Sequence, residues 1–145
     1  MKTVRLYTDG SCHGNPGPGG WAAILEHDGK NRELSGAERA TTNNQMELRA
    51  VIEGLRALRE PCRVEVYSDS QYVVNGMKSW LASWKRRGWL TADRKPVKNV
   101  ELWRELDRLA AQHHVSWHWV RGHADHPQNT RCDALANAAI ATLEA

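Results

Sequence analysis

The sequence predicts an α/β fold in which a five-stranded mixed sheet is flanked by helices. The order of the expected elements supports this class, because three strands and a helix are followed by strands that alternate with helices. The near-repetition of one strand pattern, residues 4–9 and again residues 64–69, supports it as well. A helix lies between these two strands, and such a crossover favours parallel pairing, whereas the short turns among the first three strands favour antiparallel pairing.

Hydrophobic periodicity and turn residues place the individual elements. Gly10 is expected to end the first strand and open a loop, residues 14–20 to form a tightly turned loop, and residues 28–30 to form a hairpin turn. Thr42 precedes the first helix with the Thr-x-x-Gln spacing of a capping box, and Pro127 suits the first turn of the last helix. The expected strands are 3–8, 21–25, 31–36, 64–68 and 115–120. The expected helices are 43–58, 71–77, 100–111 and one that begins at 127. The last helix is expected to bury Cys132, Leu135, Ala136, Ala139, Ile140 and Leu143.

Two acids stand at matching positions of the repeated strand pattern. If the two strands pair in parallel and in register, Asp9 and Asp69 lie side by side, about 5 Å apart at the backbone. Two carboxylates this close repel each other unless a proton or a cation lies between them, so the pair is a candidate for a divalent metal site. The alternative is structural: both acids begin turns, and Asp69 caps the helix that follows. The two strands alone leave both interpretations open.

Two further acids border the buried faces of helices. Glu47 lies in the first turn of the helix expected at 43–58, where an acid also suits a helix cap. Asp133 lies inside the last helix, where aspartate has poor helix propensity, although a surface pair with Arg131 would also explain it. Carboxylate oxygens suit Mg²⁺ or Mn²⁺, whereas Zn²⁺ prefers cysteine and histidine. A cluster of these acids beside a basic surface would suit two-metal hydrolysis of a phosphodiester.

Residues 79–99 supply a basic surface, because they hold lysines and arginines against the single acid Asp93, with tryptophans interleaved. The whole chain has 145 residues and a formal net charge of +3, which fits one ordered domain. Its three cysteines form no even disulfide framework, and no apolar signal or membrane-spanning run is present. We therefore expect a single soluble, cytoplasmic domain over residues 1–145, with a basic helical protrusion at about 79–99.

Short motifs occur in order along nearly the whole chain. They are Thr8-Asp9-Gly10-Ser11, Gly14-Asn15-Pro16-Gly17, Thr41-Thr42-Asn43-Asn44-Gln45-Met46-Glu47-Leu48, Ser68-Asp69-Ser70-Gln71-Tyr72, Gly122-His123-Ala124 and Arg131-Cys132-Asp133-Ala134-Leu135-Ala136. Together they resemble type 1 ribonuclease H, and Trp84-Lys85-Arg86-Arg87-Gly88-Trp89 is similar to the basic protrusion of the bacterial ribonuclease HI members. The resemblance implies a monomeric endonuclease that hydrolyses the RNA strand of an RNA–DNA hybrid, largely independently of sequence, and leaves 5′-phosphate and 3′-hydroxyl ends.

The resemblance also implies roles for individual residues. Asp9, Glu47, Asp69 and Asp133 would bind one or two Mg²⁺ ions, for which Mn²⁺ can substitute, and carry catalysis. His123 would take a proton from the attacking water or help the product to leave. The substrate-binding residues would be Cys12, Asn15, Thr42, Asn43, Asn44, Gln71, Trp80, Trp84, Lys85, Arg86 and Arg87.

Other considerations concern substrate choice and the competing functions. The 2′-hydroxyl is the local feature that separates RNA from DNA, and short amide side chains beside the acids suit its recognition. Glu26 stands where some family members carry a basic residue near the phosphate pocket, and this would weaken that contact. A catalytically inactive hybrid-binding module is disfavoured because all four acids are present. A DNA recombinase of the same fold is disfavoured because the chain lacks extra DNA-recognition domains.

Overall fold

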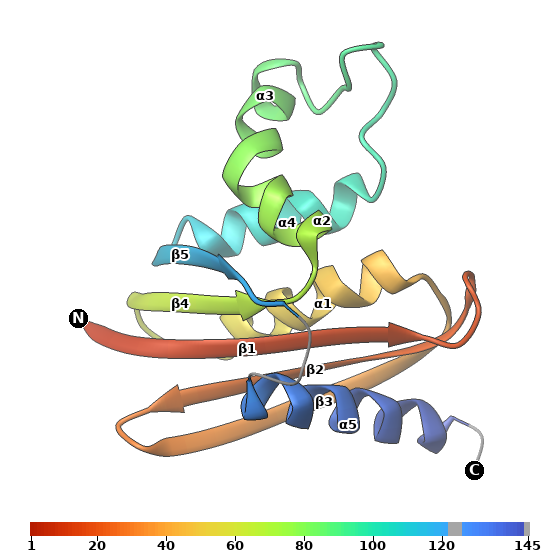
Figure 1. The fold of residues 1–145 in the computed structure, drawn as a ribbon. Coiled ribbons are helices and arrows are strands. Elements are labelled where there is room, and N and C mark those ends of the chain that lie inside the picture. The colour runs from red at the N-terminus through yellow and green to blue at the C-terminus, as the bar shows by residue number, and fades with distance from the viewer. Residues whose placement is uncertain (122–125, 144–145) are drawn as a thin grey trace.

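The computed structural model describes residues 1–121 and 126–143, which form a mixed sheet with helices on both faces (Figure 1). The strands are β1 (Lys2–Cys12), β2 (Gly17–His27), β3 (Lys30–Thr41), β4 (Cys62–Ser68) and β5 (His114–Trp119). The helices are α1 (Asn43–Arg56), α2 (Gln71–Asn75), the π-helix η1 (Gly76–Trp80), α3 (Leu81–Arg86), α4 (Val100–Ala110) and α5 (Pro127–Thr142). Among the described residues, no helix is both long and apolar enough to cross a membrane.

The sheet confirms the predicted pairing of its strands. Its order is β3-β2-β1-β4-β5, with β1, β2 and β3 antiparallel and with β4 and β5 added in parallel. The register between β1 and β4 is also the predicted one, because Tyr7 lies opposite Tyr67. A two-residue turn at Asp28 and Gly29, both with positive φ, joins β2 to β3 and confirms the predicted hairpin.

Hydrophobic layers cover the two faces of the sheet. Helix α1 packs on β1 and β2 and contacts α4, whereas α5 packs across β1, β2 and β3 on the opposite face (Figure 1). The larger core lies on the α1 side and includes the fully buried side chains of Leu6, Ile52 and Trp103. The smaller core lies under α5 and includes Tyr7 and Cys132. Each face of β1 is therefore covered by a different helix.

The first two strands are longer than their hydrophobic patterns predict. Strand β1 does not end before Asp9, and Gly10 does not open a loop: the strand continues to Cys12 and stays paired with β2 as far as Gly19. The expected loop at 14–20 is correspondingly shorter, because β2 begins at Gly17. Glycine has no side chain that could show a periodic pattern. The pairing of the β2 glycines with the end of β1 therefore depends on tertiary contacts and has no local signal in the sequence.

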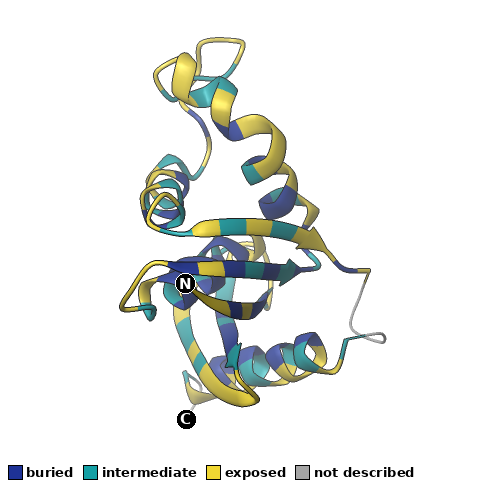
Figure 2. Ribbon diagram, turned by 90° about the vertical axis from the view of Figure 1, so that its left-hand side faces the viewer, coloured by how far each residue is buried: buried dark blue, intermediate teal, exposed yellow. Residues whose placement is uncertain are grey.

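A continuous helical run replaces the short helix expected at 71–77. Helices α2, η1 and α3 follow one another from Gln71 to Arg86. Gly76 lies inside this run and permits close packing, because a β-carbon there would lie 2.1 Å from the ring of Trp103. Helix α3 and the loop after it stand away from the sheet and belong to the basic protrusion (residues 79–99; Figure 1), where exposed residues predominate (Figure 2).

Two smaller differences concern α1 and α5. The Thr42 side chain caps α1 by accepting a hydrogen bond from the Gln45 backbone amide at 3.2 Å. The reciprocal bond of a capping box is not formed, because the Gln45 side chain bonds elsewhere. Leu135 and Leu143 are only partly buried, because the α5 backbone itself approaches the sheet closely at Ala136.

Candidate active site

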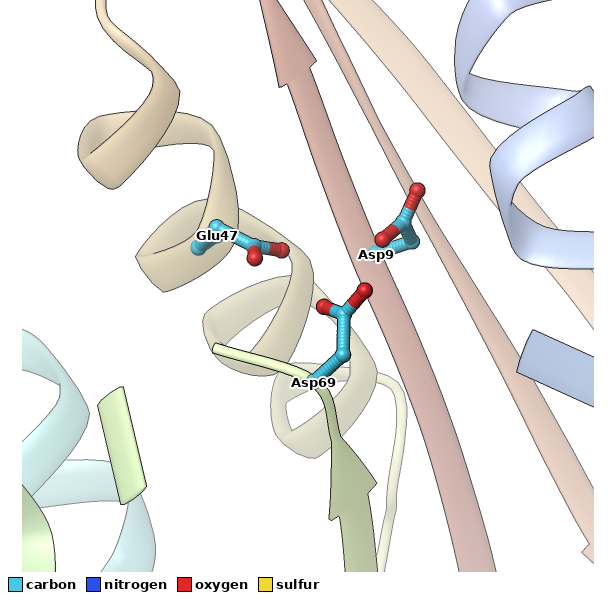
Figure 3. Close-up of side chains that lie close together, drawn as sticks. All are labelled: Asp9, Glu47 and Asp69. Carbon is cyan, nitrogen blue, oxygen red and sulfur yellow. The ribbon is translucent and has the colours of Figure 1, made fainter. Parts of the chain in front are cut away.

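Three carboxylates from three different elements point toward one another (Figure 3). Asp9 comes from β1, Glu47 from α1, and Asp69 from the residue after β4. One oxygen atom of each side chain lies within 4.8 Å of the corresponding oxygens of the other two. Asp133 of α5 lines the same pocket, which has a volume of about 380 Å³. The structure therefore gathers all four acids that the sequence singled out.

The direct contact between α1 and β1 brings Glu47 to Asp9. A β-carbon on Gly10 would lie 2.4 Å from the backbone nitrogen of Glu47, so only glycine permits this approach. The Gly10 backbone amide donates a hydrogen bond to the Glu47 carboxylate. The Glu47 Oε1 atom is buried and has no hydrogen-bond partner within the described part of the chain. A buried carboxylate oxygen without a donor is a position that a cation can satisfy.

Asp69 is positioned by its backbone and by its neighbours. The indole Nε1 of Trp119 donates a hydrogen bond to the Asp69 carbonyl oxygen at 3.1 Å. The residue that caps α2 is Ser70, whose hydroxyl accepts a hydrogen bond from the Val73 amide at 3.2 Å. The alternative in which Asp69 caps this helix is therefore wrong. Its carboxylate faces the other acids instead (Figure 3).

Asp133 belongs to a polar row on α5. One helical turn later, the Asn137 amide nitrogen donates to the Asp133 carbonyl oxygen at 2.9 Å and to its Oδ1 at 3.3 Å. The Asn137 Oδ1 in turn lies 3.5 Å from the hydroxyl of Ser11 on β1. Arg131 pairs with Glu33 at 2.9 Å, so the surface pair considered for Asp133 is not what holds this arginine.

The grouping of negative charge raises the pKa values of the two most buried acids. Burial, followed by the charges of Asp69 and Asp133, raises the pKa of Asp9 from 3.8 to about 8. Burial, followed by the charges of Asp9 and Asp69, raises the pKa of Glu47 well above its usual 4.5. No lysine or arginine among the described residues lines the pocket. A divalent cation is therefore the natural counter-ion for this site.

Amide side chains lie directly beside the carboxylates. Asn43, Asn44 and Gln71 line the same pocket as the acids. The Asn15 Oδ1 accepts a hydrogen bond from the Asn43 backbone amide at 3.2 Å, which ties the loop after β1 to the first turn of α1. Thr42 occupies the cap of that helix. These residues form a polar rim around the acids, at the positive end of the α1 dipole.

The basic protrusion has exposed cations, but they are not equivalent. Lys85 pairs with Asp107 of α4 at 3.1 Å, and this neutralises part of its charge. Arg86 donates a hydrogen bond to the hydroxyl of Ser83 at 3.1 Å, and both Arg86 and Arg87 are exposed. The charges of the two arginines are therefore less neutralised than that of Lys85.

The tryptophans at the base of the protrusion form a cluster. Trp103 is fully buried, and the ring centroid of Trp84 lies 5.2 Å from that of Trp103. Trp80 lies 5.8 Å from Trp84 by the same measure and is 38% exposed. Trp84 thus contributes chiefly to packing, whereas Trp80 presents a ring to solvent.

A chain of hydrogen bonds connects the rim of the pocket to the end of the protrusion. The Gln45 side-chain amide on α1 donates to Asn99 Oδ1 at 3.2 Å. Asn99 donates to the hydroxyl of Tyr72 at 3.1 Å, and the Trp103 indole donates to the same hydroxyl at 3.0 Å. Tyr72 itself lines the acidic pocket. The protrusion is therefore held in a fixed position relative to the acids.

Three residues from the sequence analysis need separate mention. The Cys12 thiol donates to the carbonyls of Gly17 and Thr41 at 3.5 and 3.4 Å, and Cys12 does not line the pocket. Glu26 pairs with Arg5 at the end of β2 opposite to Thr42 and does not line the acidic pocket; its effect on a phosphate contact stays a prediction. His123 lies outside the described residues.

Sequence reasoning missed several residues that support the site. Asn129 and Asn137 on α5 and Trp119 at the end of β5 bond directly to the backbone or side chains that carry the acids. Asn129, Asp133 and Asn137 recur every four residues, and this spacing on a helix with a buried face was the available signal. The hydrogen bond from the Trp119 indole to the Asp69 carbonyl could not be predicted from local sequence, because it joins segments that are distant in the chain.

Comparison with known proteins places the chain in a family. The family model described as RNase H matches residues 1–141. A ribonuclease H from Chelativorans sp. is 59% identical over 144 residues, which cover 99% of this chain and 89% of the relative. A ribonuclease H from Ralstonia nicotianae is 61% identical over 140 residues, which cover 97% of this chain and 93% of the relative.

Solved structures agree with this placement. The crystal structure of LC9-RNase H1, described as a type 1 RNase H with the type 2 active-site motif, superposes with a TM-score of 0.88 at 38% identity and covers 98% of this chain and 74% of that one. The RNase H domain from Mycobacterium tuberculosis gives a TM-score of 0.77 at 29% identity and covers 98% of this chain and 96% of that one. With nearly its whole length matched by the family model and by close relatives, this chain belongs to the ribonuclease H family.

Proposed function

We propose that this chain is an endonuclease that hydrolyses the RNA strand of an RNA–DNA hybrid. The observation that carries the proposal is the gathering of Asp9, Glu47 and Asp69 within 4.8 Å in a chain of this family. Asp133 lines the same pocket, and a basic protrusion stands beside it. The arrangement combines a site for divalent cations with a surface for a polyanion.

The donor set fits a hard divalent cation, and we infer that the cation is Mg²⁺, with Mn²⁺ able to replace it. All the proposed ligands are carboxylates, from Asp9, Glu47, Asp69 and Asp133, and the unpartnered Glu47 oxygen supports the fit. When one or two ions are bound, they supply activation of the attacking water and stabilisation of the leaving oxygen. The four carboxylates would fix the position of the bound cation in the pocket.

The polar rim would position the hybrid. Asn43, Asn44 and Gln71 lie where their amides can meet sugar hydroxyls next to the acids. Asn15 and Thr42 hold the α1 terminus, which can accept a phosphate of the DNA strand. These are contacts to sugar and phosphate, so cleavage would depend little on base sequence.

The remaining parts of the proposal concern the protein as a whole. We take residues 1–145 as one catalytic domain that acts as a cytoplasmic monomer, with the basic protrusion as the surface that grips the hybrid. His123 would move a proton during water attack or product release, and the products would carry 5′-phosphate and 3′-hydroxyl ends. Trp80 would press on the DNA sugars, whereas Arg86 and Arg87 would bind phosphates.

The test uses strand-labelled duplexes incubated with and without Mg²⁺. We expect cleavage of the RNA strand in the hybrid only, and no cleavage of all-DNA or all-RNA duplexes. Loss of cleavage in the presence of a chelator, with hybrid binding retained, would support the metal assignment. Binding without cleavage at any concentration of Mg²⁺ or Mn²⁺ would favour the inactive hybrid-binding module. Cleavage of duplex DNA would favour the recombinase class.

A further inference from the structure

The strands that carry Asp9 and Asp69 separate just before these residues. Strands β1 and β4 are paired in parallel only as far as Tyr7 and Tyr67. Beyond this point β4 ends at Ser68, while β1 continues with β2 as its only partner in the sheet. The distance between the two carboxylates is therefore not fixed by a backbone ladder between their own residues.

The side chain of Asn129 bridges the two strands where they separate. This residue of α5 is fully buried. Its Nδ2 donates to the Thr8 carbonyl oxygen at 3.3 Å and to the Tyr67 carbonyl oxygen at 3.2 Å. Both partners are acceptors, so the amide nitrogen, which carries two hydrogens, must be the atom that faces them. One side chain thus bonds to the residue before Asp9 and to the strand that leads into Asp69.

The same side chain fixes α5 relative to both strands. Asp133 follows Asn129 by one helical turn, and Asn137 follows by two. A shift of α5 along the sheet would move Asp133 and would break the bonds of Asn129 to both strands at once. Three of the elements that carry the acids, β1, β4 and α5, therefore meet at one amide group.

The second polar atom of Asn129 argues against a role in packing alone. Its Oδ1 is buried and has no hydrogen-bond partner in residues 1–121 and 126–143. Burying a carbonyl oxygen without a donor is unfavourable, and an apolar side chain with the same branching, such as leucine, would avoid this penalty. The two donated bonds must therefore supply something that leucine would not.

We propose that Asn129 is a positioning residue that sets the spacing of Asp9, Asp69 and Asp133 and thereby the affinity of the site for divalent cations. The inference rests on the proposed function, in which these acids hold the cation. When residues that hold metal ligands in place without binding the metal are removed, metal affinity or activity typically falls by about 10- to 100-fold. Asn129 does not line the acidic pocket, so it would act on the cation only through the positions of the acids.

The test compares Asn129→Leu with a matched control on the same helix. Leucine keeps the number and branching of the side-chain heavy atoms of asparagine, is somewhat larger, and removes both hydrogen bonds. Ile140→Ala is the control, because Ile140 is also fully buried on α5 but lies against Gly20 of β2 and does not line the acidic pocket. Mn²⁺ binding is measured without substrate by calorimetry, and KM and kcat for the hybrid are measured over a range of Mg²⁺ concentrations.

For Asn129→Leu we expect the dissociation constant for Mn²⁺ and the half-saturating Mg²⁺ concentration to rise by about 10-fold or more, with KM for the hybrid unchanged. For Ile140→Ala we expect a lower melting temperature and wild-type metal affinity. Wild-type metal affinity in Asn129→Leu, or an equal loss in Ile140→Ala, would overturn the inference. Absence of metal binding in the wild-type protein would instead overturn the proposed function.

Asn129→Ser provides the same test if the leucine variant does not fold. Serine is too short to reach both carbonyls, and the space it leaves suits a water molecule. Folded Asn129→Ser with weakened Mn²⁺ binding would support the positioning role. Folded Asn129→Ser with wild-type Mn²⁺ binding would overturn it.

Discussion

The backbone of Glu47 rests directly on Gly10, with no room for a side chain between them: a β-carbon on Gly10 would lie 2.4 Å from the Glu47 nitrogen. This contact joins α1 to β1 at the residue that follows Asp9. It places two carboxylates from distant parts of the sequence in one pocket. The site therefore depends on a backbone contact as much as on its acidic side chains.

Gly10→Ala should push α1 away from β1 and displace Glu47. Overpacking of this kind typically costs about 1–3 kcal/mol of unfolding free energy, and cleavage should fall together with stability. Urea denaturation and a hybrid-cleavage assay measure the two effects. Gly29→Asn is the control, because nothing lies within 4 Å of its β-carbon position and asparagine tolerates its positive φ. A Gly10→Ala protein with wild-type stability and turnover would contradict the contact described here.

Asp9→Asn and Asp69→Asn should each abolish cleavage and leave hybrid binding intact. Each change removes a charge from the proposed cation site with almost no change in shape. Turnover with labelled hybrid and binding by fluorescence anisotropy separate the two effects. Asp28→Asn, in the β2–β3 turn, changes the same chemical group far from the pocket and should keep full activity. Substantial turnover in either active-site variant would argue against the carboxylate cluster.

The metal-free protein should lose stability as the pH rises from about 4 to about 8. The pKa of Asp9 is raised from 3.8 to about 8 in the folded state, so between these values the folded protein binds more protons than the unfolded chain. Stability is therefore highest below this window and declines through it, and the raised pKa of Glu47 acts in the same direction. Urea denaturation at pH 5 and pH 8 in a chelator measures the decline.

Divalent cations should oppose this pH dependence, because they bind the ionised carboxylates. Added Mg²⁺ should therefore raise the melting temperature more at pH 8 than at pH 5. Asp9→Asn should flatten the pH dependence in the chelator and reduce the effect of Mg²⁺. A wild-type protein whose metal-free stability rises between pH 5 and pH 8 would contradict the pKa shifts of the two acids.

Neutralising the protrusion should raise KM and weaken its dependence on salt. Arg86→Ala and Arg87→Ala should have larger effects than Lys85→Ala, because Asp107 already neutralises part of the Lys85 charge. KM is measured at several salt concentrations, with Arg32→Ala on β3 as a control for net charge. Equal effects of all four substitutions would mean that overall charge, rather than this surface, attracts the hybrid.

Asn99→Gly should loosen the protrusion without straining the chain. Asn99 has a φ of 59°, which glycine adopts freely, so the change removes only the side chain that links Gln45 to Tyr72. KM for the hybrid should rise while the affinity for Mn²⁺ stays unchanged. A fall in Mn²⁺ affinity instead would show that the hydrogen-bond chain acts on the acids.

The strand pairing was predictable because the two halves of the sequence repeat one pattern. Val4–Tyr7 and Val64–Tyr67 alternate apolar and polar residues in nearly the same order, and with a side-chain period of two a slip of one residue would put the apolar side chains on the wrong face. The acids could be singled out for the same reason, because Asp9 and Asp69 stand at matching positions of the repeated pattern and the other two border helical stripes. The hydrophobic periodicity of the sequence is thus sufficient to predict the position of a residue where burial determines which face of a strand or helix that residue occupies.

Tertiary contacts determined the features that the sequence did not reveal. The extension of β1 to Cys12 depends on pairing with glycines of β2, which have no pattern of their own. The helical run continues through Gly76, where the ring of Trp103 leaves no room for a side chain. Asn129 bonds to two backbone carbonyls, and no side-chain pattern records the position of a carbonyl.

The π-helix η1 decides which way the protrusion faces. A π-helical turn accommodates one more residue than an α-helical turn, and each residue of an α-helix advances the chain by about 100° around its axis. Removing a single residue within Gly76–Trp80 would therefore rotate everything after it by about that angle, with Arg86 and Arg87 carried to a different side. The orientation of the cationic arm toward the catalytic pocket is thus encoded in the length of one short segment.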